Sequence, residues 1–346
     1  MPRKSRIDAP GALHHIIIKG IERKPIFKDA QDYRNFLKRL GNVLIETSTP
    51  CFAWALMTNH VHLLLKTGVF PISMIMRRLL TGYAQQFNRR HKRHGHLFQN
   101  RFKSFLCEED AYLLELVRYI HLNPLRVGMV RDLKSLATCW KCGHSALMGK
   151  CKYEWQDTDY VLELFGRTVG SARRSYYAFV KKGANQGRRH ELVGGGLIRS
   201  VGGWSALKSI RSAGLRIMCD ERILGSGNFV DSVLKLANEE YEKKTLVMAK
   251  GIGLDTLVGA VAKHFGIGRD IIESASKQRT ISRARSVICY LAVDKLMISG
   301  ADIARKLNLS PSAVSKLVVR GRMDSLAKQI ENEIFDFKQI ITEPGE

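Results

Sequence analysis

The amino-acid sequence predicts an α+β protein in which a sheet-containing N-terminal region precedes an all-α C-terminal domain. Short apolar runs rich in β-branched residues, typical of strands, occur at residues 11–20, 51–57 and 60–66. Apolar residues at helical spacing lie between and after these runs, and the C-terminal part contains only helical patterns. We therefore expect three parts: residues 1–150, a connecting region at 151–245, and a C-terminal domain at 246–346.

The first predicted elements follow one another as strand, helix, strand and strand. A β-branched run between Gly11 and Gly20 predicts the first strand. Residues 29–45 repeat apolar side chains at helical spacing, with Asp29 placed to cap the helix. Residues 51–57 and 60–66 are separated by a short Thr58–Asn59 turn, so they predict a hairpin.

Two longer helices are predicted next. Residues 71–90 carry one apolar stripe. Residues 108–122 begin with three acidic residues, which favour a helix N-terminus, and the pattern ends before Pro124.

The charge balance predicts a polyanionic partner. The chain has 56 Lys and Arg against 32 Asp and Glu, a formal net charge of +24 and a pI near 9.9. No apolar stretch approaches the about 20 residues of a membrane-spanning helix, and no lipidation motif is visible. The basic N-terminus leads into no apolar signal core. We expect a cytoplasmic protein that binds nucleic acid rather than membranes.

The seven cysteines predict no disulfide framework, because their spacing is irregular and the chain is long. Cys139, Cys142, His144 and Cys151 have donor types that zinc accepts. The interval before Cys151 is unusual and no second CxxC follows, so we favour cysteines that hold no metal and pack beside a buried Trp140.

His60 and His62 form the pattern with the clearest chemistry. Residues two apart on a strand point to one face, so both imidazoles lie side by side. Neutral imidazole is a common ligand of divalent ions. The alternative is a strand that carries two histidines by chance. Histidine-triad hydrolases are disfavoured, because Leu64 stands where their third histidine would be.

Tyrosines on the predicted helices are candidate nucleophiles. Tyr119 and Asn123 are four apart, so they can share one face, with Asn123 offering an oxygen ligand. Tyr112 is a rival on the same helix, and residue chemistry alone does not rank it below Tyr119. Tyr83 lies within an apolar stripe, which favours a core position.

The segment from Asn88 to Lys103 mixes cations with aromatic rings. Such a mixture neutralises phosphates and offers stacking surfaces to unpaired bases. The alternative is a solvated basic loop. The residues that we expect to contact DNA here are Arg89, Arg90, Lys92, Arg93, Phe98, Arg101 and Lys103.

Several of these motifs together resemble the HUH single-tyrosine transposases, most strongly the branch associated with repetitive extragenic palindromes (REP). The resemblance covers residues 8–150. It rests on HVH at residues 60–62, RRHKRHGHLFQNRFKS at 89–104, YIHLNPLRVG at 119–128 and GHSALMG at 143–149.

The resemblance implies a ferredoxin-like core, an antiparallel sheet with helices packed on one face. It also implies Mg²⁺ or Mn²⁺ held by His60, His62 and Asn123, with Tyr119 attacking single-stranded DNA beside a hairpin. The product is a 5′-phosphotyrosine bond that can be rejoined to another end without ATP. The family relationship further implies a bacterial, nucleoid-associated transposase.

The connecting region contains two predicted helices, at residues 161–165 and 172–180. It then becomes rich in glycine and arginine at residues 183–203. Three successive glycines at 194–196 lack a following P-loop lysine, so we expect a flexible linker there.

The C-terminal domain has a helix-turn-helix pattern at residues 299–317, with Ser310 as the cap of the second helix. Residues 261–296 resemble the region preceding this motif in the DNA-binding domain of the replication initiator DnaA, although the usual Asp-His-Thr-type triplet is absent. A plain helical bundle is the alternative. The resemblance and the exposed pattern together indicate duplex contacts through Arg283, Arg285, Ser312, Ser315, Lys316 and Arg320.

The sequence leaves other functions open. A DNA-binding regulator derived from a transposase would keep the same motifs without cutting DNA. RNA binding by the sheet is disfavoured, because histidines stand where RNA recognition motifs carry aromatic rings. A homodimer, with active sites built in one chain or shared between two, is left open as well.

Overall fold

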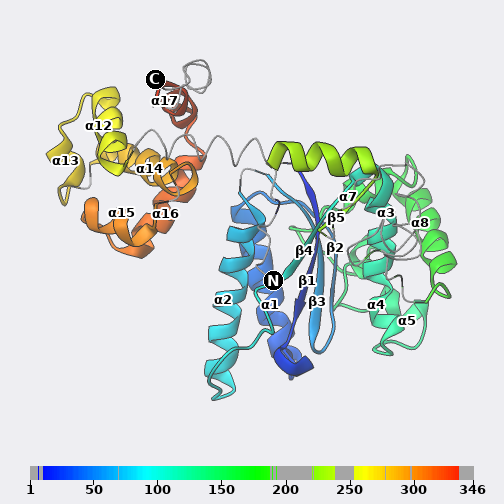
Figure 1. Ribbon diagram of the computed structural model, residues 1–346. Coiled ribbons are helices and arrows are strands. Elements are labelled where there is room, and N and C mark those ends of the chain that lie inside the picture. Colours follow the sequence, from blue (N-terminus) through cyan, green and yellow to red (C-terminus); the bar gives the residue numbers. More distant parts are fainter. Residues whose placement is uncertain are drawn as a thin grey trace, which may run out of the picture. The chain divides into compact units, whose positions relative to one another are not determined.

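The computed structural model describes residues 7, 11–68, 70–187, 189, 192, 220, 222–237, 253–276, 278–296 and 298–334. The chain divides into two compact units, residues 1–234 and 235–346, and each unit is described by itself below (Figure 1). The basic N-terminal hexapeptide and the three glycines at 194–196 lie outside the described residues.

The first unit is built on a five-stranded sheet with strand order β2-β3-β1-β4-β5. β1 (Leu13–Lys19) is central and pairs antiparallel with β3 (His60–Lys66) and β4 (Lys103–Cys107). β2 (Cys51–Leu56) pairs antiparallel with β3, which confirms the predicted hairpin. These four strands have the order expected of a ferredoxin-like sheet. β5 (Ile223–Leu224) adds a short parallel strand beside β4.

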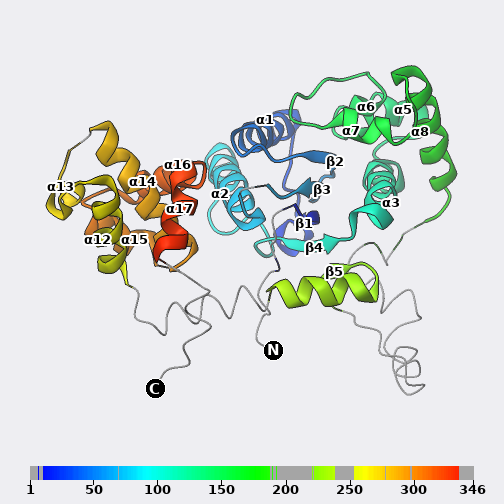
Figure 2. The same cartoon turned by 90° about the horizontal axis from the view of Figure 1, so that it is seen from above.

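Helices cover both faces of the sheet. α1 (Ala30–Glu46) and α2 (Ile72–Arg90) form the predicted layer on one face, and α3 (Glu109–His121) lies on the other (Figure 2). Asp29 caps α1 through the backbone N–H groups of Gln31 and Asp32, as predicted. The expectation of helices on one face alone is therefore incomplete. β1, β2 and β3 are buried along nearly their whole length, because apolar side chains alternate to both sides of the sheet.

The layer that contains α3 is extended by the helices that follow it. α4 (Asn123–Arg126), α5 (Leu133–Ala137) and α6 (His144–Leu147) are short, and α7 (Thr158–Glu163) and α8 (Val169–Gly183) come from the connecting region. A common core joins α3, α8 and this face of the sheet through Leu116, Val117, Tyr176, Leu64 and Phe105. Residues 227–237 form a further helix after β5.

The second unit contains only helices in its described part. They are α12 (Leu254–Phe265), α13 (Arg269–Glu273), α14 (Arg279–Asp294), α15 (Gly300–Lys306), α16 (Pro311–Arg322) and α17 (Ser325–Ile334). α16 packs closely on α14 at Gly321, where a Cβ atom would lie 2.0 Å from the carbonyl oxygen of Ser286. Within the described residues of the chain, no helix is both long and apolar enough to cross a bilayer.

Candidate active site on the sheet

Both predicted metal histidines lie on β3 and point to the sheet face that α3 covers. In the β1–β3 register His60 is opposite Lys19, and His62 is opposite Ile17. Directly paired residues on antiparallel strands share a face, so these four side chains lie on one side of the sheet. The ring centroids of His60 and His62 are 5.3 Å apart. His62 is buried, whereas His60 is half-buried at the end of the strand.

Both histidines are held at Nδ1 by a neighbouring side chain. His60 Nδ1 lies 2.7 Å from Oδ1 of Asn59, and His62 Nδ1 lies 2.9 Å from Nε2 of His15. Burial lowers the pKa of His62 well below its usual value, and the nearby His15, His60 and Lys19 lower it further. Burial lowers the pKa of His15 to about 4. The buried rings are therefore neutral at pH 7, the form that binds metal ions.

Tyr119 of α3 lies beside two histidines of the sheet, His62 and His15. Its ring centroid is 5.9 Å from that of His62 and 6.0 Å from that of His15, both in edge contact. Its exposed fraction is 9%, so only the edge of the residue is open to solvent. Of the three candidate tyrosines, Tyr119 is the one whose ring contacts the histidines of the sheet.

The rival tyrosines have other surroundings. Tyr83 is buried in the aromatic core beneath α1 and α2, and its hydroxyl donates to the carbonyl of Ile26 at 2.6 Å. Burial raises the pKa of Tyr83 well above its usual range. Tyr112 lies near the start of α3, and burial followed by the Glu108 carboxylate raises its pKa. Neither phenol has an environment that favours ionisation.

Asn123 is the third predicted ligand. It begins α4 directly after the α3 cap, has an exposed fraction of 7%, and its Nδ2 has no hydrogen-bond partner within the described residues. A buried amide with an unused donor is unusual and fits a site that receives a hydrogen-bond acceptor, whereas the atom of this side chain that could bind a metal is Oδ1. Two imidazoles and one amide oxygen form a donor set suited to Mg²⁺ or Mn²⁺.

Cations surround the open end of the site. The Arg126 guanidinium lies 5.2 Å from the centre of the Tyr119 ring, and its Nη1 donates to the Tyr119 carbonyl at 3.1 Å. Lys19 is exposed beside His60, and burial, Lys103 and Arg23 lower its pKa. Because Lys19 and Lys103 repel each other, an anion bound between them would relieve an existing electrostatic cost.

The predicted helix-turn-helix of the second unit is formed by α15 and α16. Ser310 caps α16 through the backbone N–H of Ala313, as predicted. Val314 and Val318 are buried, and the opposite face of α16 is exposed. The predicted DNA-contacting residues on that exposed face are Ser312, Ser315, Lys316 and Arg320.

The two predicted arginines of α14 are both bonded within the unit, and Arg285 alone is buried. Arg283 pairs with Asp324 at 2.7 Å. Arg285 has an exposed fraction of 5%, and its guanidinium donates to the carbonyls of Ile272, Ser274 and Ser276. Its burial removes Arg285 from any surface that DNA can reach. The helical spacing of apolar residues in the sequence does not indicate that Arg285 will donate to three backbone carbonyls.

Comparisons with known proteins support this reading of the two units. Residues 10–123 match the family described as "Transposase IS200 like". The N-terminal region resembles an IS200-like transposase. A solved structure of "the REP associates tyrosine transposase bound to a REP hairpin" aligns with 46% of this chain and 93% of its own, at 16% identity and a TM-score of 0.36. That similarity is too low to carry a structural argument.

The second unit has its own relatives. Residues 254–319 match the family described as "Bacterial dnaA protein helix-turn-helix". The chromosomal replication initiator protein DnaA of Ureaplasma parvum serovar 3 is 30% identical over 78 residues, which are 22% of this chain and 17% of that protein. The chain thus spans less than a fifth of this curated relative. The predicted resemblances, of the N-terminal region to a transposase and of the C-terminal region to the DnaA helix-turn-helix, are confirmed.

The basic segment of the IS200-like region is only partly open. The side chains of Arg89, Lys92, Arg101 and Lys103 are exposed. Arg93 donates to Asn88 and to the carbonyl of His96. Phe98 is half-buried with its ring 6.4 Å from that of Tyr83, and Phe102 is buried. The segment therefore offers cations, but its rings pack inward instead of forming an open stacking surface.

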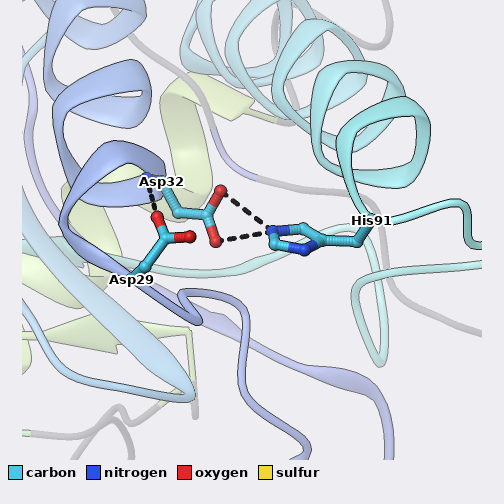
Figure 3. Close-up of side chains that lie close together, drawn as sticks. All are labelled: Asp29, Asp32 and His91. Atoms are coloured by element: carbon cyan, nitrogen blue, oxygen red, sulfur yellow. Dashed lines mark hydrogen bonds and ion pairs between the residues drawn. The ribbon is translucent and has the colours of Figure 1, made fainter.

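Arg90 belongs to an ion-pair network at the ends of α1 and α2. Ligand atoms of Asp29, Asp32 and His91 lie within 4.8 Å of one another (Figure 3). The Arg90 guanidinium contacts both carboxylates, at 2.6 Å to Asp29 and 2.5 Å to Asp32. The Arg90 guanidinium and the His91 ring, whose Nε2 lies 2.9 Å from Asp32, thus bond the carboxylates at the start of α1 to the end of α2.

The cysteine group does not form a second cluster of metal ligands within the described residues. Cys142 is buried, whereas Cys139 and Cys151 are half-buried, and none of the three forms a disulfide. Trp140 is half-buried rather than buried, with the Arg34 guanidinium 5.7 Å from its ring centre.

Three residues of the site were not predicted from the sequence: His15, Lys19 and Arg126. Lys19 could have been found from the alternation of β1, which places it on the same face as His15. The contact of His15 with His62 depends on strand register, which a single sequence does not define.

Proposed function

We propose that the protein is a metal-dependent transposase that cuts and rejoins single-stranded DNA through Tyr119. The observation that carries this proposal is the arrangement of Tyr119 on α3 over His62 of β3, with His60 on the same strand face. The match of residues 10–123 to IS200-like transposases supports it. The proposed domains are residues 1–150 for catalysis, 151–245 for connection and 246–346 for duplex binding.

His60, His62 and Asn123 would hold Mg²⁺ or Mn²⁺. When bound, the ion supplies positive charge to the scissile phosphate and stabilises the charge that develops on its oxygens. Lys19 and Lys103 would hold the DNA strand electrostatically at the exposed end of the site. The buried histidines contribute no charge of their own, so the ion and the lysines provide most of the attraction for phosphate.

In this reaction the Tyr119 oxygen attacks phosphorus and loses its proton, while the bond to the 3′ oxygen breaks and that oxygen gains a proton. The strand is then joined to the protein through a 5′-phosphotyrosine bond, and attack by a free 3′-hydroxyl reverses the step. Arg126 lies close enough to the Tyr119 ring to favour its ionised form. Single-stranded DNA, cut beside a hairpin, is the proposed substrate.

The second unit would place the enzyme on duplex DNA. α16 presents Ser312, Ser315, Lys316 and Arg320 on its exposed face. A second helix of a helix-turn-helix motif commonly enters the major groove with such residues outward. The match to the helix-turn-helix of bacterial DnaA supports this assignment.

The deciding experiment is formation of a covalent protein–DNA adduct. The full-length protein would be incubated with Mn²⁺ and labelled single-stranded hairpins cut from the DNA that flanks its gene, and then denatured. We expect an adduct that requires the metal, disappears in Tyr119→Phe and persists in Tyr112→Phe, the matched control on the same helix. Tight hairpin binding without any adduct would instead support the DNA-binding regulator.

A further inference from the structure

We propose that His15 is a positioning residue that fixes the tautomer of His62, so that Nε2 of His62 carries the lone pair available to the metal ion. This inference rests on the proposed function in one respect, because that function makes His62 a ligand. The tautomer itself is a property of the metal-free protein and can be measured without any activity.

The hydrogen-bond chain starts at a backbone carbonyl. His15 Nδ1 lies 3.0 Å from the carbonyl oxygen of Leu192. A carbonyl oxygen only accepts, so Nδ1 of His15 must carry the proton. His15 is fully buried, and burial favours the neutral ring. A neutral imidazole has one N–H, which leaves Nε2 of His15 as an acceptor.

The second link carries this assignment to His62. His15 Nε2 and His62 Nδ1 are 2.9 Å apart, and this contact needs one proton between the two nitrogens. Because the His15 nitrogen has none, His62 Nδ1 donates. Nε2 of His62 is then bare. The two rings are also stacked, with centroids 5.2 Å apart and an interplanar angle of 24°, so His15 restrains the orientation of His62 as well.

His60 reaches the same tautomer by a separate route. Asn59 Nδ2 donates to the carbonyl of Arg23 at 3.0 Å, so Oδ1 is the amide atom that faces His60. His60 Nδ1 lies 2.7 Å from that oxygen and therefore donates to it. Both histidines of β3 thus hold Nδ1 protonated, and in the neutral ring of His62 this leaves Nε2 able to bind an ion.

The chain of bonds also gives the connecting region a role in the site. Leu192 is 177 residues from His15 in the sequence, and it is buried in the same apolar core as Tyr119 and Leu116. The Leu192 carbonyl accepts the hydrogen bond from His15, the first histidine of the hydrogen-bond chain. We infer that Leu192 supports the geometry of the proposed metal ligands.

His14 provides a matched control within the same strand. It is as fully buried as His15, but it points to the opposite face of the sheet, and its Nδ1 lies 3.0 Å from Oγ of Ser104. A substitution at His14 therefore removes a buried histidine from β1 without touching His62.

The first test measures the tautomer in the metal-free full-length protein. Long-range ¹H–¹⁵N spectra of ¹⁵N-histidine-labelled protein distinguish the two neutral tautomers, and His62→Gln identifies the His62 signals. We expect the Nδ1–H form of His62 in the unsubstituted protein and in His14→Leu. An Nε2–H form of His62 in the unsubstituted protein would overturn the proposal, and this reading requires only that the His62→Gln protein used for the assignment is folded.

The second test measures Mn²⁺ affinity by electron paramagnetic resonance. His15→Leu should bind Mn²⁺ roughly 10- to 100-fold more weakly, the usual loss when an outer-shell partner is removed. His15→Gln should recover much of the affinity, because its Oε1 can accept from His62 Nδ1, and His14→Leu should bind normally. Unchanged affinity in His15→Leu would contradict the proposal. If the unsubstituted protein itself binds no Mn²⁺, the proposed metal site fails, while the tautomer spectra still decide the role of His15.

Discussion

Two clusters in the first unit contain the same residue types, two buried histidines and one tyrosine, in different surroundings. The sheet cluster consists of His15, His62 and Tyr119, and the sealed cluster consists of His121, His144 and Tyr176. α3 contributes Tyr119 to the sheet cluster and His121 to the sealed cluster. The two residues are two apart, so they point to different sides of the helix.

The clusters differ in the contacts recorded between the tyrosine and the histidines. In the sealed cluster, Nδ1 of His121 and Nδ1 of His144 lie 2.8 and 2.7 Å from the Tyr176 hydroxyl. Tyr176 is fully buried, and burial raises its pKa well above the usual range. In the sheet cluster Tyr119 contacts His62 and His15 through their rings, and the Nδ1 atom of His62 is bonded to His15.

The clusters also differ in their access to charge. The sheet cluster adjoins the half-buried His60, the exposed Lys19 and the Arg126 guanidinium. The sealed cluster is enclosed by α3, α6 and α8. Histidines and a tyrosine in proximity therefore do not define a catalytic site. An opening to solvent and nearby cations separate the cluster that can bind a phosphate from the one that stabilises the core.

The largest expected effect comes from removing each tyrosine hydroxyl. Tyr119→Phe should lower covalent adduct formation by several orders of magnitude, because the nucleophile is lost. Tyr176→Phe should retain adduct formation but lower the free energy of unfolding by about 1–3 kcal/mol, since buried histidine nitrogens lose their partner. Gel analysis of the adduct and denaturant unfolding measure the two effects. Loss of the adduct in a folded Tyr176→Phe protein would show that the sealed cluster is also required for adduct formation.

Removing one histidine from each cluster should separate them by metal affinity. His62→Ala should weaken Mn²⁺ binding by more than roughly 100-fold, the upper range for outer-shell substitutions, because a direct ligand is removed. His144→Asn should leave Mn²⁺ affinity unchanged while the protein becomes less stable. Calorimetric titration of both variants gives the affinities. Equal affinities in the two variants would argue against a metal at His62.

The sequence predicted local features of the fold, but it did not predict the long-range contacts of the sheet cluster. The β3 strand, the α1 cap at Asp29 and the α16 cap at Ser310 follow from local patterns, and the structure confirms all three. β4 was missed, because its residues Lys103–Cys107 follow a basic segment without a turn signal. The second helical layer and the burial of Arg285 depend on tertiary packing, which periodicity does not encode.

Both clusters should make the first unit less stable as the pH falls. Burial lowers the pKa of His15 and of His144 to about 4, from 6.5 in the unfolded chain. Between pH 6.5 and 4 the unfolded state binds protons that the folded state does not, so the free energy of unfolding decreases as the pH drops through this window. Each such histidine contributes at most about 1.4 kcal/mol per pH unit.

Tryptophan fluorescence is suited to this measurement, because all four tryptophans of the chain precede residue 235. Denaturant unfolding at pH 6.5 and at pH 5 should show the decrease, and His144→Asn should reduce the dependence on pH. Saturating Mn²⁺ should make the free energy of unfolding depend more steeply on pH, since protons compete with the ion at the sheet cluster alone. A pH-independent stability over this range would show that the histidines are not buried as neutral rings.

The smallest expected effect concerns the cations at the open end of the sheet cluster. Lys19→Gln and Lys103→Gln should each weaken binding of a single-stranded hairpin several-fold in low salt. If each lysine contacts one phosphate, each substitution should flatten the plot of log affinity against log salt concentration by about 0.7. Fluorescence anisotropy at several salt concentrations measures the slope.

Lys38→Gln is the matched control, because Lys38 is an exposed lysine on α1, in the helix layer that covers the other face of the sheet. Lys38→Gln changes the net charge by the same amount as the other two substitutions. A purely long-range attraction would therefore lower the hairpin affinity of all three variants equally. A larger change in slope for Lys19 and Lys103 would place the strand at the sheet cluster. Equal changes would mean that the net charge of +24 attracts DNA without directing it to Tyr119.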